Sequence, residues 1–394
     1  MSVTDQDIVI VAAKRTAMGG FQGSLASVPS PKLAATAVKG LLDATGVAGE
    51  QVDELLMGCV LPAGLGQAPA RQAALGAGLP LSVGATTVNK VCGSGMKTVM
   101  LAHDLIKAGS AEVVIAGGME SMSQAPYLLD KARGGMRMGH GKVMDHMFLD
   151  GLEDAYTGGA MGTFAQKTAD DFGLTREAMD AFALSSLEKA NAAISSGAFE
   201  AEIVPVTVSG RGGDVEVKID EQPGNAKPEK IPALRPAFAK DGTITAANSS
   251  SISDGAAALM LMSRAKASEL GLEVMATIKG HSTHAQEPSM FTTAPVSAMA
   301  NLLAKLGWNK DEVDLYEINE AFAMVTMLAI SELGLDGAKV NVNGGACALG
   351  HPIGCSGARL LVTLIHALKA RGLKRGMASL CIGGGEATAL AIEI

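Results

Sequence analysis

The chain has few aromatic residues and no excess of positive charge. Its 394 residues include one Trp, and aromatics make up 3% of the sequence. Lys and Arg number 32 against 40 Asp and Glu, a formal net charge of -8. Nucleic-acid and membrane-surface proteins attract phosphates with clustered basic residues, and no basic run stands out here, so we expect neither partner. An anionic small-molecule substrate is still possible, because a few local cations can hold one.

Long apolar runs are also missing. The longest, residues 321–330 and 256–262, are much shorter than the roughly 20 residues that a transmembrane helix needs. The polar, acidic start has none of the features of a signal or transit peptide. Five cysteines, an odd number without framework spacing, indicate reduced thiols. Together these absences predict a cytoplasmic protein that is soluble and has no disulfides.

The composition that is present favours closely packed α/β layers. Hydrophobic residues make up 48% of the chain, which also contains 48 glycines. The length exceeds one ordinary domain, so two or three packed units are expected. Apolar runs that alternate with helical patterns predict buried strands at 8–12, 54–60, 86–88 and 113–116, and helices at 32–45, 66–77 and 95–108.

One order of parts occurs twice along the chain. Cys92-Gly-Ser-Gly opens a predicted helix that is followed by a strand at 113–116 and a glycine pair. Gly354-Cys-Ser-Gly opens a second helix, followed by a strand at 378–382 and three glycines. The strands at 52–58 and 313–318 form another matching pair. Such internal similarity predicts two similar α/β halves.

The segment between these halves has a different composition. Residues 121–247 contain glycines among Met, Arg and His, a Pro/Lys-rich stretch, and a helix pair at 163–171 and 176–195. This pattern predicts an inserted loop domain that could serve as a lid or ligand platform. We therefore expect an N-terminal half at 1–120, completed by about 248–272, the loop domain at 121–247, and a C-terminal half at 273–394.

Cys92 is the first candidate for chemistry. A strand runs into Asn89-Lys-Val-Cys-Gly-Ser-Gly and then a helix, which places the thiol at a helix N-terminus. Backbone N–H groups there favour the thiolate, so we expect a lowered pKa for Cys92. The alternative is a structural cysteine, which is the fate of most buried free thiols.

Three other residues lie at turns that could face the same cleft. His351, in a glycine-rich turn before a helix, could act as a general base, although a lone His is more often structural. Cys381 ends the last apolar strand before three glycines, where a small core residue is the simpler interpretation. Asn319 follows the strand 315–318, where an Asn is more often a cap or turn residue.

Together these motifs resemble the thiolase family over essentially the whole chain. The matching strings are Asn89-Lys-Val-Cys-Gly-Ser-Gly-Met, Asn319-Glu-Ala-Phe-Ala, Gly344-Gly-Ala-Cys-Ala-Leu-Gly-His-Pro-Ile-Gly and Cys381-Ile-Gly-Gly-Gly. The resemblance implies an α/β fold of two βαβαβαββ-type halves, layered α/β/α/β/α, with an inserted loop domain. It also implies transfer of acyl groups between coenzyme A thioesters through an acyl-cysteine, condensing two acetyl-CoA to acetoacetyl-CoA and coenzyme A, or the reverse thiolysis.

The resemblance also assigns roles to the candidate residues. It makes Cys92 the nucleophile, His351 its activator, and Cys381 the group that removes or returns the α-proton of the second thioester. Asn319, through a held water, would cradle one developing oxyanion together with His351. The backbone N–H groups of Cys92 and Gly383 would cradle the other. No metal or resident cofactor is implied, because coenzyme A thioesters are the substrates.

The family's coenzyme A contacts fall on eight positions: Leu152, Met161, Phe238, Ala246, Ser249, Ser250, Ala321 and Phe322. The aromatics among them could instead be core residues, and the serines a turn. Four stretches depart from the acetyl-specific pattern. Ala160 stands where the family often has His, and Gly224-Asn225-Ala226 stands where it often has an Arg. Phe291-Thr-Thr-Ala-Pro replaces the usual Met-Gly-x-Gly-Pro near the acyl pocket, and Glu386-Ala387 replaces the common Met-Gly or Gln-Gly after the last glycines.

Three other functions compete with this interpretation. Gly93-Ser-Gly95 mimics the start of a dinucleotide fingerprint, but Thr98 and the absence of the acidic residue argue against an oxidoreductase. A non-catalytic binding module would be expected to lack Cys92, His351 or Cys381. A degradative 3-ketoacyl-CoA thiolase of broader chain length remains open, although we expect preference for short acyl chains and a homotetramer, with a dimer as the alternative. Cys59, Cys347 and Cys355 are expected to be packing residues, and His281 and His284 to have no partner ligands nearby.

Overall fold

The computed structural model describes residues 4–210 and 212–394. Residues 1–3, which begin the predicted N-terminal half, and residue 211 lie outside the described residues. The helices are α1 Ser30–Thr45, α2 Pro69–Gly76, α3 Ser94–Lys107, α4 Met161–Asp171, α5 Arg176–Ser195, α6 Glu221–Asn225, α7 Arg264–Glu269, α8 Ala294–Leu306, α9 Ala323–Leu333, α10 Ala346–Leu349 and α11 Ser356–Arg371. The strands are β1 Ile8–Arg15, β2 Gly19–Gly20, β3 Glu54–Gly58, β4 Gly84–Val88, β5 Val113–Ser121, β6 Tyr127–Leu128, β7 Met144–Asp145, β8 Val206–Gly210, β9 Gly213–Val217, β10 Ser253–Ser263, β11 Ala276–Ala285, β12 Leu315–Ile318, β13 Arg375–Ile382 and β14 Glu386–Glu393.

The main sheet has two halves with the same internal pattern. Its order is β12-β13-β14-β11-β1-β10-β5-β3-β4, with β2 paired to β10. In each half a parallel pair, β3 with β5 or β12 with β13, is extended by antiparallel strands. The halves meet where β1 pairs with β11 through Val9 and Ile10. The repeat predicted from the sequence is therefore present in the fold.

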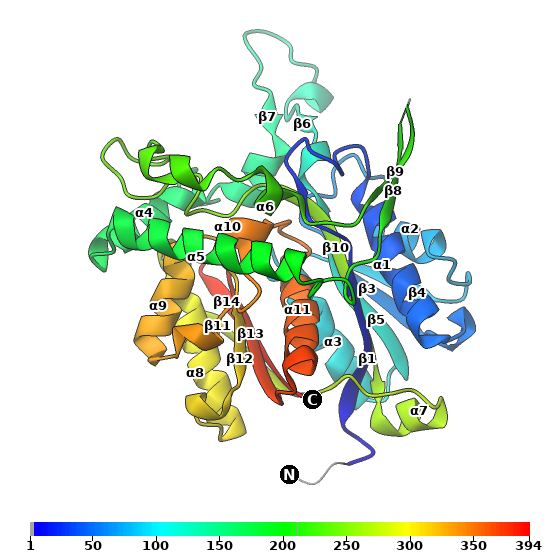
Figure 1. The fold of residues 1–394 in the computed structure, drawn as a ribbon. Coiled ribbons are helices and arrows are strands. Elements are labelled where there is room, and N and C mark those ends of the chain that lie inside the picture. The colour runs from blue at the N-terminus through cyan, green and yellow to red at the C-terminus, as the bar shows by residue number, and fades with distance from the viewer. Residues whose placement is uncertain (1–3, 211) are drawn as a thin grey trace.

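Helices cover both outer faces and fill the centre. α3 and α11, the two helices of the predicted repeat, pack against each other between the strands of the two halves. α1 and α2 cover the outer face of the N-terminal half, and α8 covers that of the C-terminal half. Figure 1 shows these layers in sequence from α8 and α9 on one side to α1 and α2 on the other. This arrangement confirms the predicted α/β/α/β/α layering.

The sequence shows why the helices that border the sheet begin and end as they do. Pro31 lies in the first turn of α1, where a missing N–H costs nothing, and Gly46 ends it with a left-handed φ of 68°. α11 ends in the same way at Gly372, with a φ of 64°. Pro31 and Gly46 thus define the two ends of α1, and Gly372 defines the C-terminal end of α11.

Two strand predictions need correction. β4 was expected to be buried, but it forms the sheet edge and all of its residues are partly or fully exposed. β5 was expected to stop before Gly117 and Gly118, yet it continues through both to Ser121. The glycines are required because a Cβ at Gly117 would lie 2.1 Å from the carbonyl oxygen of Ala257 on the paired strand β10. They are therefore packing positions within the strand.

The segment between β5 and β10 lies over one end of the sheet. It contains α4, α5 and two small hairpins, β6–β7 and β8–β9, which project from the body of the molecule in Figure 1. The predicted boundaries at residues 120, 247 and 273 stay predictions. None of the helices within residues 4–210 and 212–394 combines the length and the hydrophobicity that a transmembrane helix requires.

Candidate active site

One cavity brings together side chains from both halves and from the segment between them. Cys92 reaches it from the start of α3, His351 from the turn before α11, and Cys381 from the end of β13. Gly383 follows β13 and lines the same cavity. Corresponding ends of the repeated βαβ units therefore supply the candidate nucleophile, the base and the second thiol.

The loop that carries Cys92 is held by its own side chains. Asn89 Oδ1 accepts a hydrogen bond from the Val91 N–H at 2.9 Å. Ser94 Oγ accepts from the Lys90 N–H at 2.8 Å and donates to the Val91 carbonyl at 2.6 Å. Val91 has a φ of 46°, a left-handed conformation that a β-branched residue rarely adopts. The surrounding bonds keep this strained turn in place directly before the thiol.

The environment of Cys92 corrects one prediction. Burial raises the pKa of the thiol to about 11, although hydrogen bonds from the backbone N–H groups of Gly383 and Cys92 lower it, and the Glu120 carboxylate raises it further. Loss of solvation outweighs the favourable backbone groups at the start of α3. The expected lowered pKa is wrong, and Cys92 rests as a neutral thiol.

His351 has a defined hydrogen-bonding partner that the sequence prediction did not include. The Ser356 hydroxyl donates to the Pro352 carbonyl at 2.9 Å. Its oxygen lies 2.5 Å from His351 Nδ1 and, having only one proton to give, must accept from Nδ1–H. The imidazole thus keeps its lone pair on Nε2. Ser356 is the first residue of α11, five positions after His351, and that spacing was the signal available in the sequence.

The charge state of His351 suits a proton acceptor. The residue is buried, and this burial, aided by the positive charge of Arg359, lowers the pKa of His351 to about 3. Imidazole is therefore neutral at pH 7. With Cys92 a thiol and His351 an uncharged base, the proton can move as the sulfur attacks rather than beforehand.

Cys381 and Asn319 lie deeper than the other candidates. Cys381 is fully buried, and this burial raises the pKa of its thiol well above the ordinary value; the nearby Cys92 sulfur adds to the rise when it is ionised. Asn319 does not line the cavity; it lies behind His351, with Nδ2 3.5 Å from each ring nitrogen. Its buried Oδ1 has no hydrogen-bond partner among the described residues.

All eight predicted coenzyme A contacts line this same cavity. Phe238 and Phe322 meet edge to face with ring centroids 6.1 Å apart. Ser249 forms an isolated backbone β-bridge with Phe322, and the Ser250 hydroxyl donates to the Ala321 carbonyl at 3.0 Å. Phe291, noted for its departure from the family pattern, is buried and also lines the cavity. Lining residues that the sequence prediction did not include are Phe148, Gly151, Gly162, Ala237, Ser251, Ile252 and Ile353.

Other predicted residues lie outside the cavity. Cys59 and Cys355 are buried, whereas Cys347 lines a neighbouring hollow. The expectation that His281 has no partner nearby is wrong: its Nε2 lies 3.0 Å from Asp104 Oδ1, which also contacts His103 Nδ1 at 2.9 Å. Both partners come from α3, whose approach to β11 the sequence pattern did not predict.

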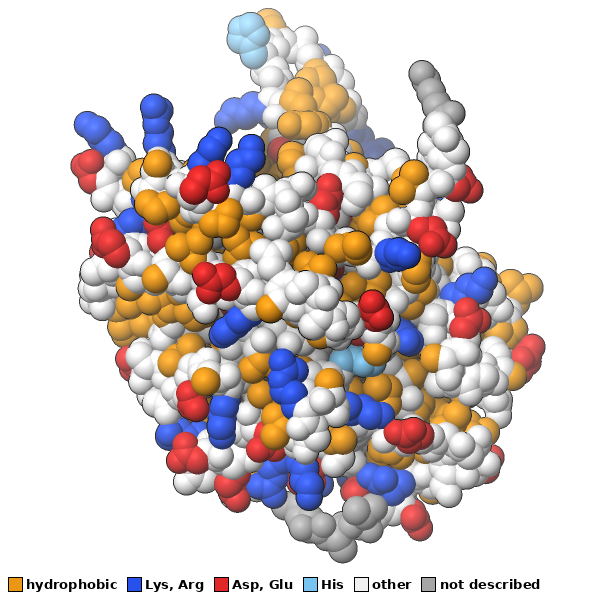
Figure 2. Space-filling view, viewed as in Figure 1, with side chains coloured by type: hydrophobic (Ala, Val, Ile, Leu, Met, Phe, Trp, Pro, Cys, Tyr) orange, Lys and Arg blue, Asp and Glu red, His pale blue; other side chains and the backbone are white. Residues whose placement is uncertain are grey.

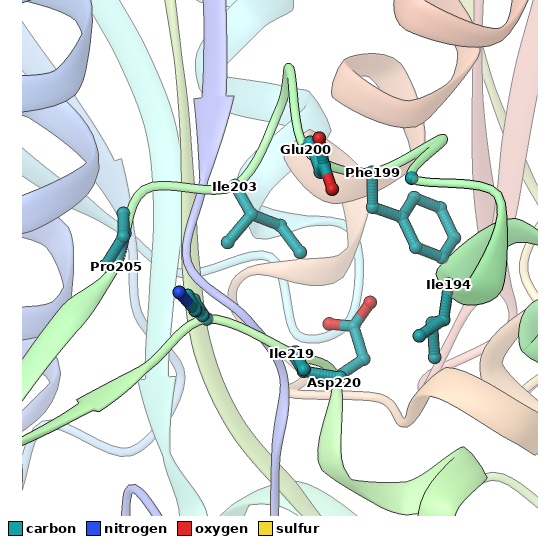
Figure 3. Close-up of a pocket in the computed structure, with 9 residues that line it drawn as sticks. Ile194, Phe199, Glu200, Ile203, Pro205, Ile219 and Asp220 are labelled. Atoms are coloured by element: carbon teal, nitrogen blue, oxygen red, sulfur yellow. The ribbon is translucent and has the colours of Figure 1, made fainter.

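A separate hollow lies beside α5 and the β8–β9 hairpin. Figure 3 shows Phe199 and Ile203 facing Asp220 across it. The Asp220 carboxylate forms a buried bidentate pair with Arg15, at 2.7 and 2.9 Å, and its Oδ1 also accepts from the Met18 N–H at 2.8 Å. Among the described residues that line this hollow there is no cysteine or histidine, in contrast to the cavity around Cys92.

Comparison with known proteins agrees with this geometry. Residues 8–265 match the thiolase N-terminal domain, and residues 272–394 match the thiolase C-terminal domain. An acetyl-CoA acetyltransferase of Pseudomonas aeruginosa is 52% identical over 98% of this chain and 99% of its own length, and that of Escherichia coli is 51% identical over the same shares. The crystal structure of the Bacillus anthracis acetyl-CoA acetyltransferase superposes with a TM-score of 0.96 at 43% identity, covering 98% of each chain. The two domain matches, the near-complete relatives and the shared fold show that this chain belongs to the thiolase family.

Proposed function

We propose that the protein is an acetyl-CoA C-acetyltransferase that condenses two acetyl-CoA molecules to acetoacetyl-CoA and free coenzyme A, and catalyses the reverse thiolysis. The observation that carries this proposal is the meeting of two thiols and a neutral imidazole in one largely apolar cavity. One thiol accounts for acyl transfer, and the second for proton removal from carbon. The extent of the similarity to acetyl-CoA acetyltransferases supports the same reaction.

In the first half-reaction, Cys92 Sγ attacks the thioester carbonyl while His351 Nε2 accepts its proton. The carbon–sulfur bond to coenzyme A breaks, the leaving thiolate takes the proton of Cys381, and acetyl-Cys92 remains. Backbone N–H groups of Cys92 and Gly383, which already lie near the Cys92 sulfur, would donate to the developing oxyanion. Each such donor contributes roughly 10²–10³-fold in rate.

In the second half-reaction, the Cys381 thiolate removes an α-proton from a second acetyl-CoA. The resulting enolate attacks acetyl-Cys92, a carbon–carbon bond forms, and Cys92 leaves and recovers its proton from His351. The raised pKa of Cys381 suits this step, because a strongly basic thiolate is needed to remove a proton from carbon. Asn319 Oδ1, unpaired in the structure and next to His351, is suited to fix a water that donates to the enolate oxygen.

Basic side chains support a coenzyme A thioester as the substrate. The hollow beside the active-site cavity shares Ala246 and Ser251 with it and is also lined by Lys227 and Lys230. Figure 2 shows Lys and Arg side chains along the edge of the molecule above α4 and α5. The pantetheine arm would lie in the apolar cavity, with the phosphates near these cations.

Separate replacement of the two thiols tests the mechanism. With acetyl-CoA, Cys381→Ala should accumulate acetyl-Cys92, detected by mass spectrometry of its peptide, without forming acetoacetyl-CoA. Cys92→Ala should form neither. Acetoacetyl-CoA production by Cys381→Ala at the unaltered rate, or the absence of any acetyl adduct on Cys92 in the unaltered protein, would exclude this function.

Acyl-chain length separates the proposal from a degradative 3-ketoacyl-CoA thiolase. Phe291 is 3% exposed and closes the cavity together with Phe238 and Phe322, which favours short acyl groups. Thiolysis rates should therefore fall steadily from 3-ketobutanoyl-CoA to longer chains, and Phe291→Ala should relax this decline. A rate maximum at long chains in the unaltered protein would favour the degradative enzyme.

The assembly is proposed to be a homotetramer in the cytoplasm. The β6–β7 projection exposes apolar side chains, including Tyr127 at 68% and Met138 at 98%. Contact between two such projections would cover them, as burial of large apolar patches favours association. Analytical ultracentrifugation should give four times the mass of the chain; a dimer is the alternative outcome.

A further inference from the structure

Two loops from opposite halves of the chain supply the N–H groups proposed to bind the oxyanion. The first contains Cys92 and ends at the start of α3. The second contains Gly383 and joins β13 to β14. Each has left-handed residues next to its donor, Val91 with a φ of 46° and Gly384 with a φ of 92°. Neither donor residue lies within a helix or strand, and the side chains of Ile382 and Lys90 cross between the two loops.

A salt bridge joins these two loops next to the residues that carry the donors. Lys90 Nζ contacts Glu386 Oε2, and the two side chains are 20% and 33% exposed. Lys90 comes two residues before Cys92, and Glu386 comes three residues after Gly383. Because both side chains of the pair are partly buried, their attraction is less screened by water than that of a surface pair. The charged pair therefore connects the short segments that carry the two donors.

Both ends of this salt bridge are attached to rigid structure. The Lys90 N–H donates to Ser94 Oγ, and its carbonyl accepts from Gly93. Glu386 begins β14, where it pairs with Ile382 and Ala285. Ile382 also packs so closely on Gly93 that a Cβ there would lie 2.3 Å from its Cδ1. The attraction between Lys90 and Glu386 therefore acts on the backbone of both loops.

We propose that Lys90 and Glu386 are positioning residues that hold the Cys92 and Gly383 N–H groups at the separation the oxyanion requires. This inference rests on the proposed thiolase function. Donors of this kind act over a narrow range of distance, about 2.7–3.1 Å to the oxyanion. A displacement of about 1 Å at such a site can cost a hundredfold in rate. Loss of one partner, which loosens the loops without removing a donor, should lower kcat by about tenfold.

The test compares Lys90→Met, Glu386→Gln and the exchanged pair Lys90→Glu with Glu386→Lys. In acetyl-CoA condensation, each single variant should lose about tenfold in kcat with KM within about twofold of the unaltered value. The exchanged pair should recover most of the loss, because it restores the attraction. Glu273→Gln, which breaks the exposed pair with Lys369, is the matched control and should behave as the unaltered protein.

The rate at which iodoacetamide alkylates Cys92, measured across pH, reports the pKa of this thiol. Together with kcat, it separates positioning from a direct charge effect. Loss of the Lys90 cation would raise the Cys92 pKa, and loss of the Glu386 anion would lower it, so a charge effect would change kcat in opposite directions in the two single variants. Positioning predicts the same loss of kcat in both. Opposite changes, a rise in KM with unchanged kcat, or no recovery in the exchanged pair would overturn the proposal. If the unaltered protein catalyses neither condensation nor thiolysis, the proposed function and this inference are overturned together. If the unaltered protein is active and the substitutions leave kcat unchanged, the inference alone is overturned.

Discussion

At the scale of single residues, the hydroxyl of Ser356 determines which nitrogen of His351 can accept a proton. With its proton given to the Pro352 carbonyl, the Ser356 oxygen accepts from Nδ1–H and leaves Nε2 without a proton. Removing the hydroxyl would allow the other tautomer, in which Nε2 carries a proton and cannot serve as a base. The effect resembles the loss of an orienting group in other base-assisted nucleophiles.

Ser356→Ala should therefore lower kcat by about tenfold, a part of the roughly 10²–10⁴-fold that a general base supplies. KM for acetyl-CoA should change little, because Ser356 does not line the cavity. Steady-state kinetics with Ser110→Ala as an exposed control will measure this. A kcat equal to that of the control would show that the tautomer is fixed by something else.

His351 also makes the folded protein sensitive to acid. Its pKa is lowered from 6.5 to about 3 in the folded state, so the unfolded chain binds the proton more readily. Above pH 6.5 the titration of His351 does not change the free energy of unfolding. As the pH falls from 6.5 toward 3, it lowers this free energy progressively. At pH 5 it should amount to about 2 kcal/mol. Urea unfolding of His351→Gln and the unaltered chain at pH 8 and pH 5 should show a smaller loss in the variant by about this amount. Equal losses in both proteins would contradict the lowered pKa.

At the scale of elements, the sequence predicted the positions of helices better than the ends and partners of strands. α1, α3, α4 and α5 lie within a few residues of their predicted ranges, because their apolar spacing and capping residues are local signals. β10, β11 and β14 were not predicted as strands, although 256–262 was recognised as an apolar run. Their pairing depends on partners far along the chain, which periodicity does not identify.

The candidate site shows the same division. Cys92, His351 and Cys381 could be located by motif because each occupies a turn of distinctive sequence. The raised pKa of Cys92 could not be predicted, since it depends on burial by side chains from distant segments. The salt bridge between Lys90 and Glu386 was hidden for the same reason: it joins residues from opposite halves of the chain.

Close packing between β5 and the turn before α11 offers a test at this scale. A Cβ at Gly118 would lie 2.0 Å from the carbonyl oxygen of Gly354, three residues after His351. Gly118→Ala should therefore force the His351 turn away from the sheet, with a loss of about 3 kcal/mol in stability and most of the activity. Gly337→Ala, where a Cβ meets no atom within 4 Å, is the matched control. Urea unfolding and condensation rates will compare them, and equal behaviour of the two variants would refute the close contact.

At the scale of the whole molecule, a buried cluster of charges joins the parts of the fold. Arg15 from β1 contacts Glu202 at 2.6 Å and Asp220 at 2.7 Å, and all three residues are fully or nearly fully buried. Glu202 also accepts from Thr363 of α11, and Arg15 lies over the ring of Phe199 at 4.8 Å. β1, the segment on each side of the β8–β9 hairpin, and α11 therefore meet in one cluster around Arg15 and Glu202.

Such a cluster stabilises a fold chiefly when it is complete, because each charge has given up its water. Asp220→Asn keeps the shape of the side chain but leaves part of the Arg15 charge unpaired in the interior. We expect a loss of about 3 kcal/mol in the free energy of unfolding. The same change at Asp171, whose pair with Lys167 is exposed, should cost less than about 1 kcal/mol. Urea unfolding at pH 8 compares the two carboxylates, and because Asp220 lies in a hollow separate from Cys92, the residual folded protein should keep its KM for acetyl-CoA. A similar cost at both positions would mean that the segments are held together by apolar packing, with Arg15 contributing little.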